Sequence, residues 1–156
     1  MKKIIILLCL VLLMTGCTKT SDEPTNESNE NATENINTED KKMQIEVKGN
    51  GKMIVYELND SQAAKDLYAQ LPLSMEVENF STNEKVFYPP QKLNTQNTPL
   101  ANADIGTLAY YSPWGDVVMF YDYFGKGGQL YELGLAISGQ ESIELLSGTI
   151  VITIKE

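Results

Sequence analysis

The sequence has no histidine and no arginine, and its two cysteines, Cys9 and Cys17, both lie near the N-terminus. Residues 43–156 therefore cannot form a disulfide, a metal site built on histidine or cysteine, or an arginine clamp on an acidic group. Histidine-dependent catalysis is excluded as well. We accordingly expect neither a metal nor another cofactor.

Positive charge is also scarce. The 156 residues carry a formal net charge of −9 at pH 7, and residues 43–156 hold 14 acidic side chains against seven lysines. Nucleic-acid binding depends on clustered Lys and Arg side chains that neutralise phosphates, so we expect no nucleic-acid partner. The glycine-rich segment 125–128 lacks the Lys-Ser/Thr pair and the following helix of a phosphate-binding loop, which argues against a nucleotide.

Residues 1–16 have the pattern of an export signal. Two lysines precede an apolar run from Ile4 to Met14, which as a helix would span roughly 16 Å, about half of a ~30 Å hydrocarbon core. The run ends in Leu13-Met14-Thr15-Gly16-Cys17, which resembles the bacterial lipobox. An ordinary secretory signal with a cysteine near its cleavage site is the alternative.

The lipobox resemblance implies that the chain is cleaved before Cys17 and that this cysteine receives acyl chains such as palmitate. Several buried acyl chains give stable membrane anchoring. The predicted location is the outer face of the bacterial cytoplasmic membrane, or the outer membrane if the host has one. Residues 17–42 hold this cysteine and a polar, acidic segment that cannot bury enough surface to fold, so we expect a disordered tether.

Residues 43–156 read as one small, mainly β domain. Apolar residues alternate over 43–47 and 150–154, the period of a half-buried strand, and Gly49-Asn50-Gly51 predicts a hairpin turn. Helical spacing is found over 62–71 and again over 141–146, whereas 92–104 and 125–128 read as loops. Roughly eight short strands with two short helices predict a closed or nearly closed antiparallel barrel, which removes sheet edges.

The order and spacing of several segments across 43–156 resemble the bacterial cyclophilin-like fold family. The segments that carry the resemblance are Leu58-Asn59-Asp60, Leu71-Pro72-Leu73, Asn83-Glu84-Lys85, Tyr88-Pro89-Pro90, the run from Gly106 to Asp116, and Val118-Met119-Phe120-Tyr121. The resemblance implies a compact cyclophilin-like β-barrel capped by short helices. It does not imply an activity, because the molecular activity of that family is not established.

Cyclophilins that isomerise prolyl bonds use a guanidinium to polarise the prolyl nitrogen, together with a histidine and an apolar pocket. This chain has neither arginine nor histidine, and lysine lacks the planar fork of a guanidinium. We therefore predict a non-enzymatic module that binds a peptide segment or a small apolar ligand. A divergent prolyl isomerase or another envelope enzyme is the alternative.

Aromatic residues are concentrated between positions 110 and 124. Tyrosine and tryptophan can orient a ligand between apolar walls, so we take part of this group as candidate ligand-binding residues. The candidates are Tyr111, Trp114, Tyr121, Tyr123 and Phe124. Alternate members of the group could instead fill the barrel core, which is the interpretation we favour for Tyr110 and Phe120.

No catalytic residue is assigned. Glu76 and Glu78 lie two residues apart on one predicted strand face, a spacing reminiscent of paired-carboxylate glycosidases. A solvated strand face explains the same pattern more simply. We attribute the Glu84-Lys85 pair to the electrostatics of a turn.

Overall fold

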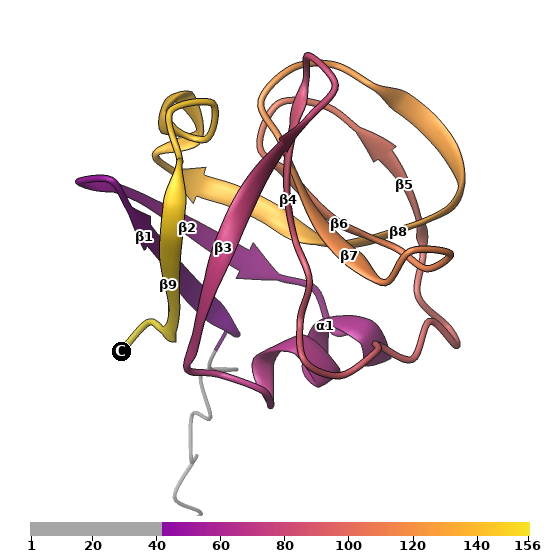
Figure 1. The fold of residues 1–156 in the computed structure, drawn as a ribbon. Coiled ribbons are helices and arrows are strands. Elements are labelled where there is room, and N and C mark those ends of the chain that lie inside the picture. The colour runs from indigo at the N-terminus through magenta and orange to yellow at the C-terminus, as the bar shows by residue number, and fades with distance from the viewer. Residues whose placement is uncertain (1–41) are drawn as a thin grey trace, which may run out of the picture. The chain divides into compact units, whose positions relative to one another are not determined.

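The computed structural model describes residues 42–156, which fold as a β-barrel (Figure 1). The predicted signal, Cys17 and all but the last residue of the predicted tether lie outside these residues. The strands are β1 (Gln44–Gly49), β2 (Lys52–Leu58), β3 (Leu73–Phe80), β4 (Glu84–Phe87), β5 (Leu100–Ala103), β6 (Thr107–Tyr111), β7 (Asp116–Phe120), β8 (Gly125–Ser138) and β9 (Gly148–Ile154). The helical elements are α1 (Gln62–Tyr68) and the 3-10 turn η1 (Gln140–Ser142).

Eight of these strands close the barrel in the order β2-β1-β9-β3-β4-β7-β6-β8, and β8 pairs back with β2. All the pairs are antiparallel. The ninth strand, β5, pairs only with β8. Because β8 is 14 residues long, its first part can pair with β5 and its last part with β2. Closure leaves no long unpaired edge on the eight strands.

The closing contact between β8 and β2 requires a glycine. Leu58 pairs with Gly134, and a Cβ atom at Gly134 would lie 2.2 Å from the backbone oxygen of Glu57. No side chain fits at that distance, so any larger residue would push the two strands apart.

The first hairpin confirms the sequence prediction. Ile45 and Val47 point into the barrel with no exposed area, as the alternation predicts. The turn places Asn50 and Gly51 at φ values of 48° and 70°. These left-handed conformations match the twist of the flanking strands, and asparagine and glycine adopt them at little cost.

Helix α1 closes one end of the barrel. The Ser61 hydroxyl oxygen accepts a hydrogen bond from the Ala64 N–H at 3.3 Å and so caps the helix N-terminus. Ala63, Ala64 and Leu67 are fully buried against the barrel. The helix ends at Tyr68, before the predicted Leu71, and Ala69 forms its C-cap.

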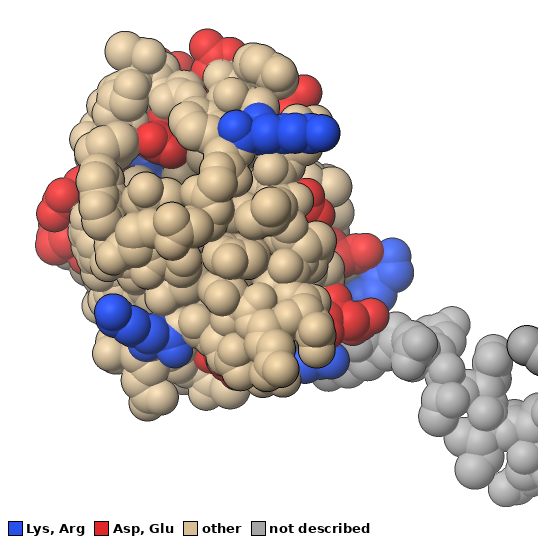
Figure 2. Space-filling view, turned by 90° about the vertical axis from the view of Figure 1, so that its right-hand side faces the viewer, with Lys and Arg blue, Asp and Glu red and all other residues tan. Residues whose placement is uncertain are grey.

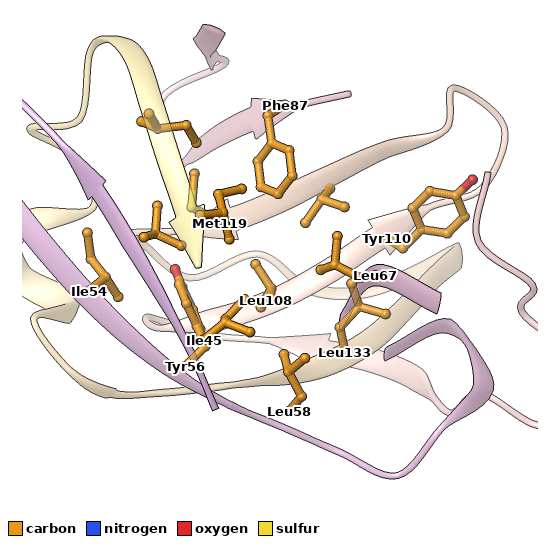
Figure 3. Packing of buried hydrophobic residues seen from close by; sticks show 14 of the residues in the cluster. Ile45, Ile54, Tyr56, Leu58, Leu67, Phe87, Leu108, Tyr110, Met119 and Leu133 are labelled. Atoms are coloured by element: carbon orange, nitrogen blue, oxygen red, sulfur yellow. The ribbon is translucent and has the colours of Figure 1, made fainter. Parts of the chain in front are cut away.

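The main core fills the barrel interior. Figure 3 shows its central side chains, with Tyr110 at one end and its hydroxyl directed away from the others. That hydroxyl accepts a hydrogen bond from the Leu93 N–H at 3.3 Å. The hydroxyl of Tyr56 points among aliphatic side chains instead, and no described residue hydrogen-bonds to it. An unpaired buried hydroxyl costs stability, so Tyr56 is a local defect in an otherwise apolar core.

A second, smaller apolar cluster lies on the outer face of the barrel. Val86, Val118 and Ala109 form one cross-strand row of β4, β7 and β6, and their sequence neighbours point inward. Strand β5 and the early part of β8 cover this row. The covering side chains in the cluster are Ala101, Ala103 and Leu130. This cover converts one patch of barrel exterior into a buried layer.

Three sequence predictions for this domain are corrected. The structure has one α-helix and a single 3-10 turn rather than two helices, because residues 143–147 do not continue η1 as a helix. The predicted loop 92–104 ends in β5, whose alternating Ala residues gave no strand signal. The predicted loop 125–128 is the start of β8, where Gly125 and Lys126 pair with Ala103 and Asn102.

Candidate functional site

A pocket of about 330 Å³ opens on the outer face of the barrel, beside the small apolar cluster. The pocket is lined by four aromatic side chains outside the small apolar cluster, by three residues of that cluster, by two glycines and by two carboxyl groups. The lining residues are Phe80, Tyr111, Trp114 and Phe124, then Val118, Phe120 and Leu130, then Gly127 and Gly128, and finally Glu84 and Asp116. The pocket is therefore outside the barrel and not in its interior.

Strand alternation determines which residues reach this pocket. On β7, Asp116, Val118 and Phe120 share the outer face, while Val117 and Met119 belong to the main core. The prediction that Phe120 fills the barrel core is therefore wrong, because it is buried in the outer cluster instead. On β4, the register pairs Glu84 with Phe120. The two carboxyl groups are thus set apart along neighbouring strands, with the Val118 row between them.

One wall of the pocket is a group of three rings. The Trp114 ring meets Phe80 edge-on at a centroid distance of 5.3 Å and meets Tyr111 in the same way at 5.4 Å. Trp114 sits in the tight β6–β7 turn, where the Gly115 N–H donates to the Tyr111 carbonyl at 2.9 Å. Its side chain is 54% exposed. Trp114 therefore forms the accessible rim of the pocket.

The opposite wall comes from the segment that leads into β8. Phe124 packs against Phe120 with a centroid distance of 5.4 Å and an interplanar angle of 39°. Gly128 also lines the pocket, and a Cβ atom added there would have no atom within 4 Å. This side of the pocket consequently has free space next to the backbone.

The two carboxyl groups are buried and lack cationic partners. Glu84 and Asp116 are only 8% and 3% exposed, and none of the lining residues is a lysine. Within residues 42–156, the ion pairs are Lys42–Glu57 and Lys48–Glu46, and neither involves a pocket residue. The Oδ1 atom of Asp116 has no hydrogen-bond partner among the described residues.

Burial perturbs both carboxyl groups. Burial and the negative charge of Asp116 together raise the pKa of Glu84 to about 7. Burial also raises the pKa of Asp116, although its own backbone N–H partly opposes this by hydrogen bonding to the carboxylate. Perturbed carboxyl groups in a pocket are typical of functional sites.

The structure brings together three of the five candidate aromatic residues. Tyr111, Trp114 and Phe124 line the pocket, whereas Tyr121 and Tyr123 do not. Tyr121 packs against the main core and its hydroxyl donates to Asn79 Oδ1 at 3.2 Å. Tyr123 is 65% exposed outside the pocket. A binding role for any of the five stays a prediction.

Sequence reasoning missed both carboxyl groups of the pocket. Glu84 and Lys85 are buried in β4, so the turn to which we attributed this pair is a strand instead. Asp116 carried one usable signal, because it directly precedes four apolar residues of a strand buried on both faces. By contrast, Glu76 and Glu78 are exposed on β3 and do not line the pocket.

The exposed surface adds little else that suggests a site. On the face shown in Figure 2, the exposed lysines lie apart from one another, and a hollow holds recessed acidic atoms with lysine atoms beside them. Residues 42–156 contain no group of three or more side chains suited to holding a metal ion. No helix in the same residues is long and apolar enough to cross a bilayer.

Comparison with known proteins identifies the family. None of the curated proteins compared with this chain matches it. A solution structure of a hypothetical protein from Archaeoglobus fulgidus is similar in fold, with a TM-score of 0.55 at 13% sequence identity, over 73% of this chain and 95% of that one. The model of the Cyclophilin-like family matches residues 47–155, which is most of the chain and nearly all of the barrel. The chain therefore belongs to the cyclophilin-like family.

Proposed function

We propose that this protein is an exported, lipid-anchored binding module that holds a peptide segment or a small ligand in its outer pocket without transforming it. The observation that carries the proposal is the pocket itself. Its apolar floor, aromatic walls and few polar groups are the usual composition of ligand sites, and its volume lies at the small end of their range.

The pocket chemistry supports binding over prolyl isomerisation. An isomerase of the cyclophilin type uses a cationic guanidinium to polarise the prolyl nitrogen, and the charged groups that line this pocket are both acidic. Lys85 follows Glu84 in sequence but pairs with Met119 of the main core, so it points to the other side of the sheet. No lining side chain can take the role of the missing guanidinium.

The proposed anchor rests on the sequence alone. The lipobox-like segment ending at Cys17 would place an acylated N-terminus in the membrane, and the acidic tether would separate the barrel from it. Mass spectrometry of the chain isolated from bacterial membranes should find a diacylglyceryl group on Cys17 as the first residue. Cys17→Ser should release the protein from the membrane, and an unmodified thiol would refute the anchor.

Binding can be followed through the protein's own fluorescence. Trp114 is the single tryptophan of the chain and lies on the pocket rim, so its emission reports pocket occupancy. The full chain in detergent would be titrated with proline-containing peptides, other short peptides and small apolar compounds. Gly127→Leu, whose Cβ would lie 3.0 Å from the Phe124 ring, should crowd the pocket and abolish the response, whereas Gly128→Ala, whose Cβ would meet no atom within 4 Å, should retain it. A panel in which nothing alters the emission would contradict the proposal.

A second candidate function, an envelope enzyme, is favoured by one observation. The pKa of Glu84, raised to about 7, suits a general acid at neutral pH, and Asp116 could serve as its carboxylate partner. Turnover of nitrophenyl esters or glycosides that is lost in Glu84→Gln would support this candidate. A cis/trans assay on a prolyl peptide tests the isomerase variant, and a rate equal to the uncatalysed one excludes it.

A further inference from the structure

We propose that the natural occupant of the outer pocket is an organic cation, an ammonium group carried on an apolar body, with Asp116 and Glu84 as its counter-charges. This inference rests on the proposed binding function and names the ligand class of the same site. The charge balance, the aromatic wall and the size of the pocket point to it independently.

The charge balance comes first. Two buried carboxyl groups face one pocket, and the lining residues from 42–156 offer them no cation. Buried charges in folded proteins are normally paired, because removal from water is costly and only a partner offsets it. Asp116 Oδ1 also lacks any hydrogen-bond donor among these residues. An ammonium group has three N–H donors and a positive charge, so it supplies both missing elements.

The aromatic wall is the second argument. Trp114 and Tyr111 lie within 5.4 Å of each other, centroid to centroid, and both line the pocket that holds the carboxyl groups. Indole and phenol rings attract cations through their negative faces, and tryptophan does so best. Aromatic rings next to carboxylates are the combination that recognises organic ammonium ions. An inorganic metal ion such as Ca²⁺ or Mg²⁺ prefers several oxygen ligands to the face of a ring.

The size of the pocket is the third argument. About 330 Å³ accommodates one small molecule or one side chain and not a folded partner. Two sources of the same chemistry fit: a free arylalkyl amine, or the lysine side chain of a peptide. A phosphate or another anion would be repelled by the carboxylates, and a neutral proline ring would leave both of them unpaired.

The test compares ligands that differ only in charge. The full chain in detergent at pH 8 would be titrated by calorimetry and Trp114 fluorescence with 3-phenylpropylamine, its neutral analogue 3-phenylpropanol, and a blocked lysine-containing peptide. A charge-assisted hydrogen bond at a buried carboxylate should make the amine bind about tenfold or more tightly than the alcohol. The ratio between peptide and free amine affinities identifies the source of the cation.

Substitutions localise the effect. Asp116→Asn and Glu84→Gln keep the side-chain shape, and each should remove most of the preference for the amine while leaving alcohol binding within about twofold. Glu78→Gln removes an exposed acid on the outer face of the adjacent strand, outside the pocket lining, and should leave the preference intact. If Asp116→Asn does not fold, Glu84→Gln alone decides.

The outcomes separate the two proposals. Equal affinity for amine and alcohol would overturn the cation inference but leave the binding function standing. An amine preference that survives both pocket substitutions would overturn the inference as well. Absence of binding by all three probes, together with no hit in the wider panel, would refute both.

Discussion

The substitution Glu84→Gln offers a direct test of the buried carboxyl group, because glutamine has nearly the shape of protonated glutamate and cannot ionise. Glu84 is 8% exposed and its pKa is raised from the ordinary 4.5 to about 7 by burial and by Asp116. The folded state therefore binds the Glu84 proton more tightly than the unfolded chain does. Protonation of Glu84 stabilises the fold, and ionisation destabilises it.

The sign and size of the effect follow from these values. The stabilising contribution is fully present below the unfolded pKa of 4.5 and is lost as pH rises through about 7. At about 1.4 kcal/mol per pKa unit, the loss approaches about 3 kcal/mol at pH 8. The free energy of unfolding of Glu84→Gln should therefore equal that of the wild type at pH 4.5. At pH 8 it should be higher than that of the wild type by up to about 3 kcal/mol.

Urea unfolding at pH 4.5, 6, 7 and 8, followed by Trp114 fluorescence and far-UV circular dichroism, measures this difference. The ionisable groups that share the pocket with Glu84 are Asp116 on β7 and Tyr111 on β6. Asp116→Asn should shift the Glu84 transition to lower pH, because it removes the repulsive charge.

Glu78→Gln serves as the matched control, since Glu78 is an exposed glutamate on the same outer face. It should change the free energy of unfolding little at any of these pH values. A stability difference between wild type and Glu84→Gln that does not vary with pH would refute the reasoning about Glu84.

Other predictions concern closure and the core. Gly134→Ala should destabilise the barrel by about 3 kcal/mol or more in urea unfolding, because its Cβ overlaps backbone, whereas Gly128→Ala should change stability by less than about 1 kcal/mol. Equal effects of the two substitutions would contradict the close approach of β2 and β8. Tyr56→Phe should raise the thermal midpoint by removing an unpaired buried hydroxyl, a gain of about 1 kcal/mol, and Tyr110→Phe should lower it because a backbone N–H loses its acceptor. A loss of stability in Tyr56→Phe would show that its hydroxyl has a partner in solution.

Much of the architecture could be predicted from local patterns. The alternation in β1 and the Gly49-Asn50-Gly51 turn are decided by a few neighbouring residues, and the structure confirms both. The family resemblance and the closed barrel were also predicted correctly. The predictions failed where the signal was not local: β5 has alternating alanines, and the start of β8 is rich in glycine.

The same difference between local and non-local signals applies to the candidate site. Its aromatic wall could be anticipated because Tyr111 and Trp114 are close in sequence, at a turn that exposes one of them. Its pair of carboxyl groups could not, because Glu84 and Asp116 come from separate strands, and the sequence offered a signal for Asp116 alone, which precedes a buried strand. Their burial depends on β5 and β8 covering that patch of the outer face.

The amino-acid sequence by itself determined the strands and turns whose signal is local, such as β1 and the turn at Asn50-Gly51, since alternation and turn residues act over a few positions. It also excluded arginine- and histidine-based chemistry, since composition does not depend on folding. Only the tertiary structure decided that the pocket lies outside the barrel and that it holds two carboxyl groups. The environment of a side chain is set by segments distant in the chain, and here a strand and a glycine-rich segment far from Glu84 turn an exposed sheet face into a partly buried acidic pocket.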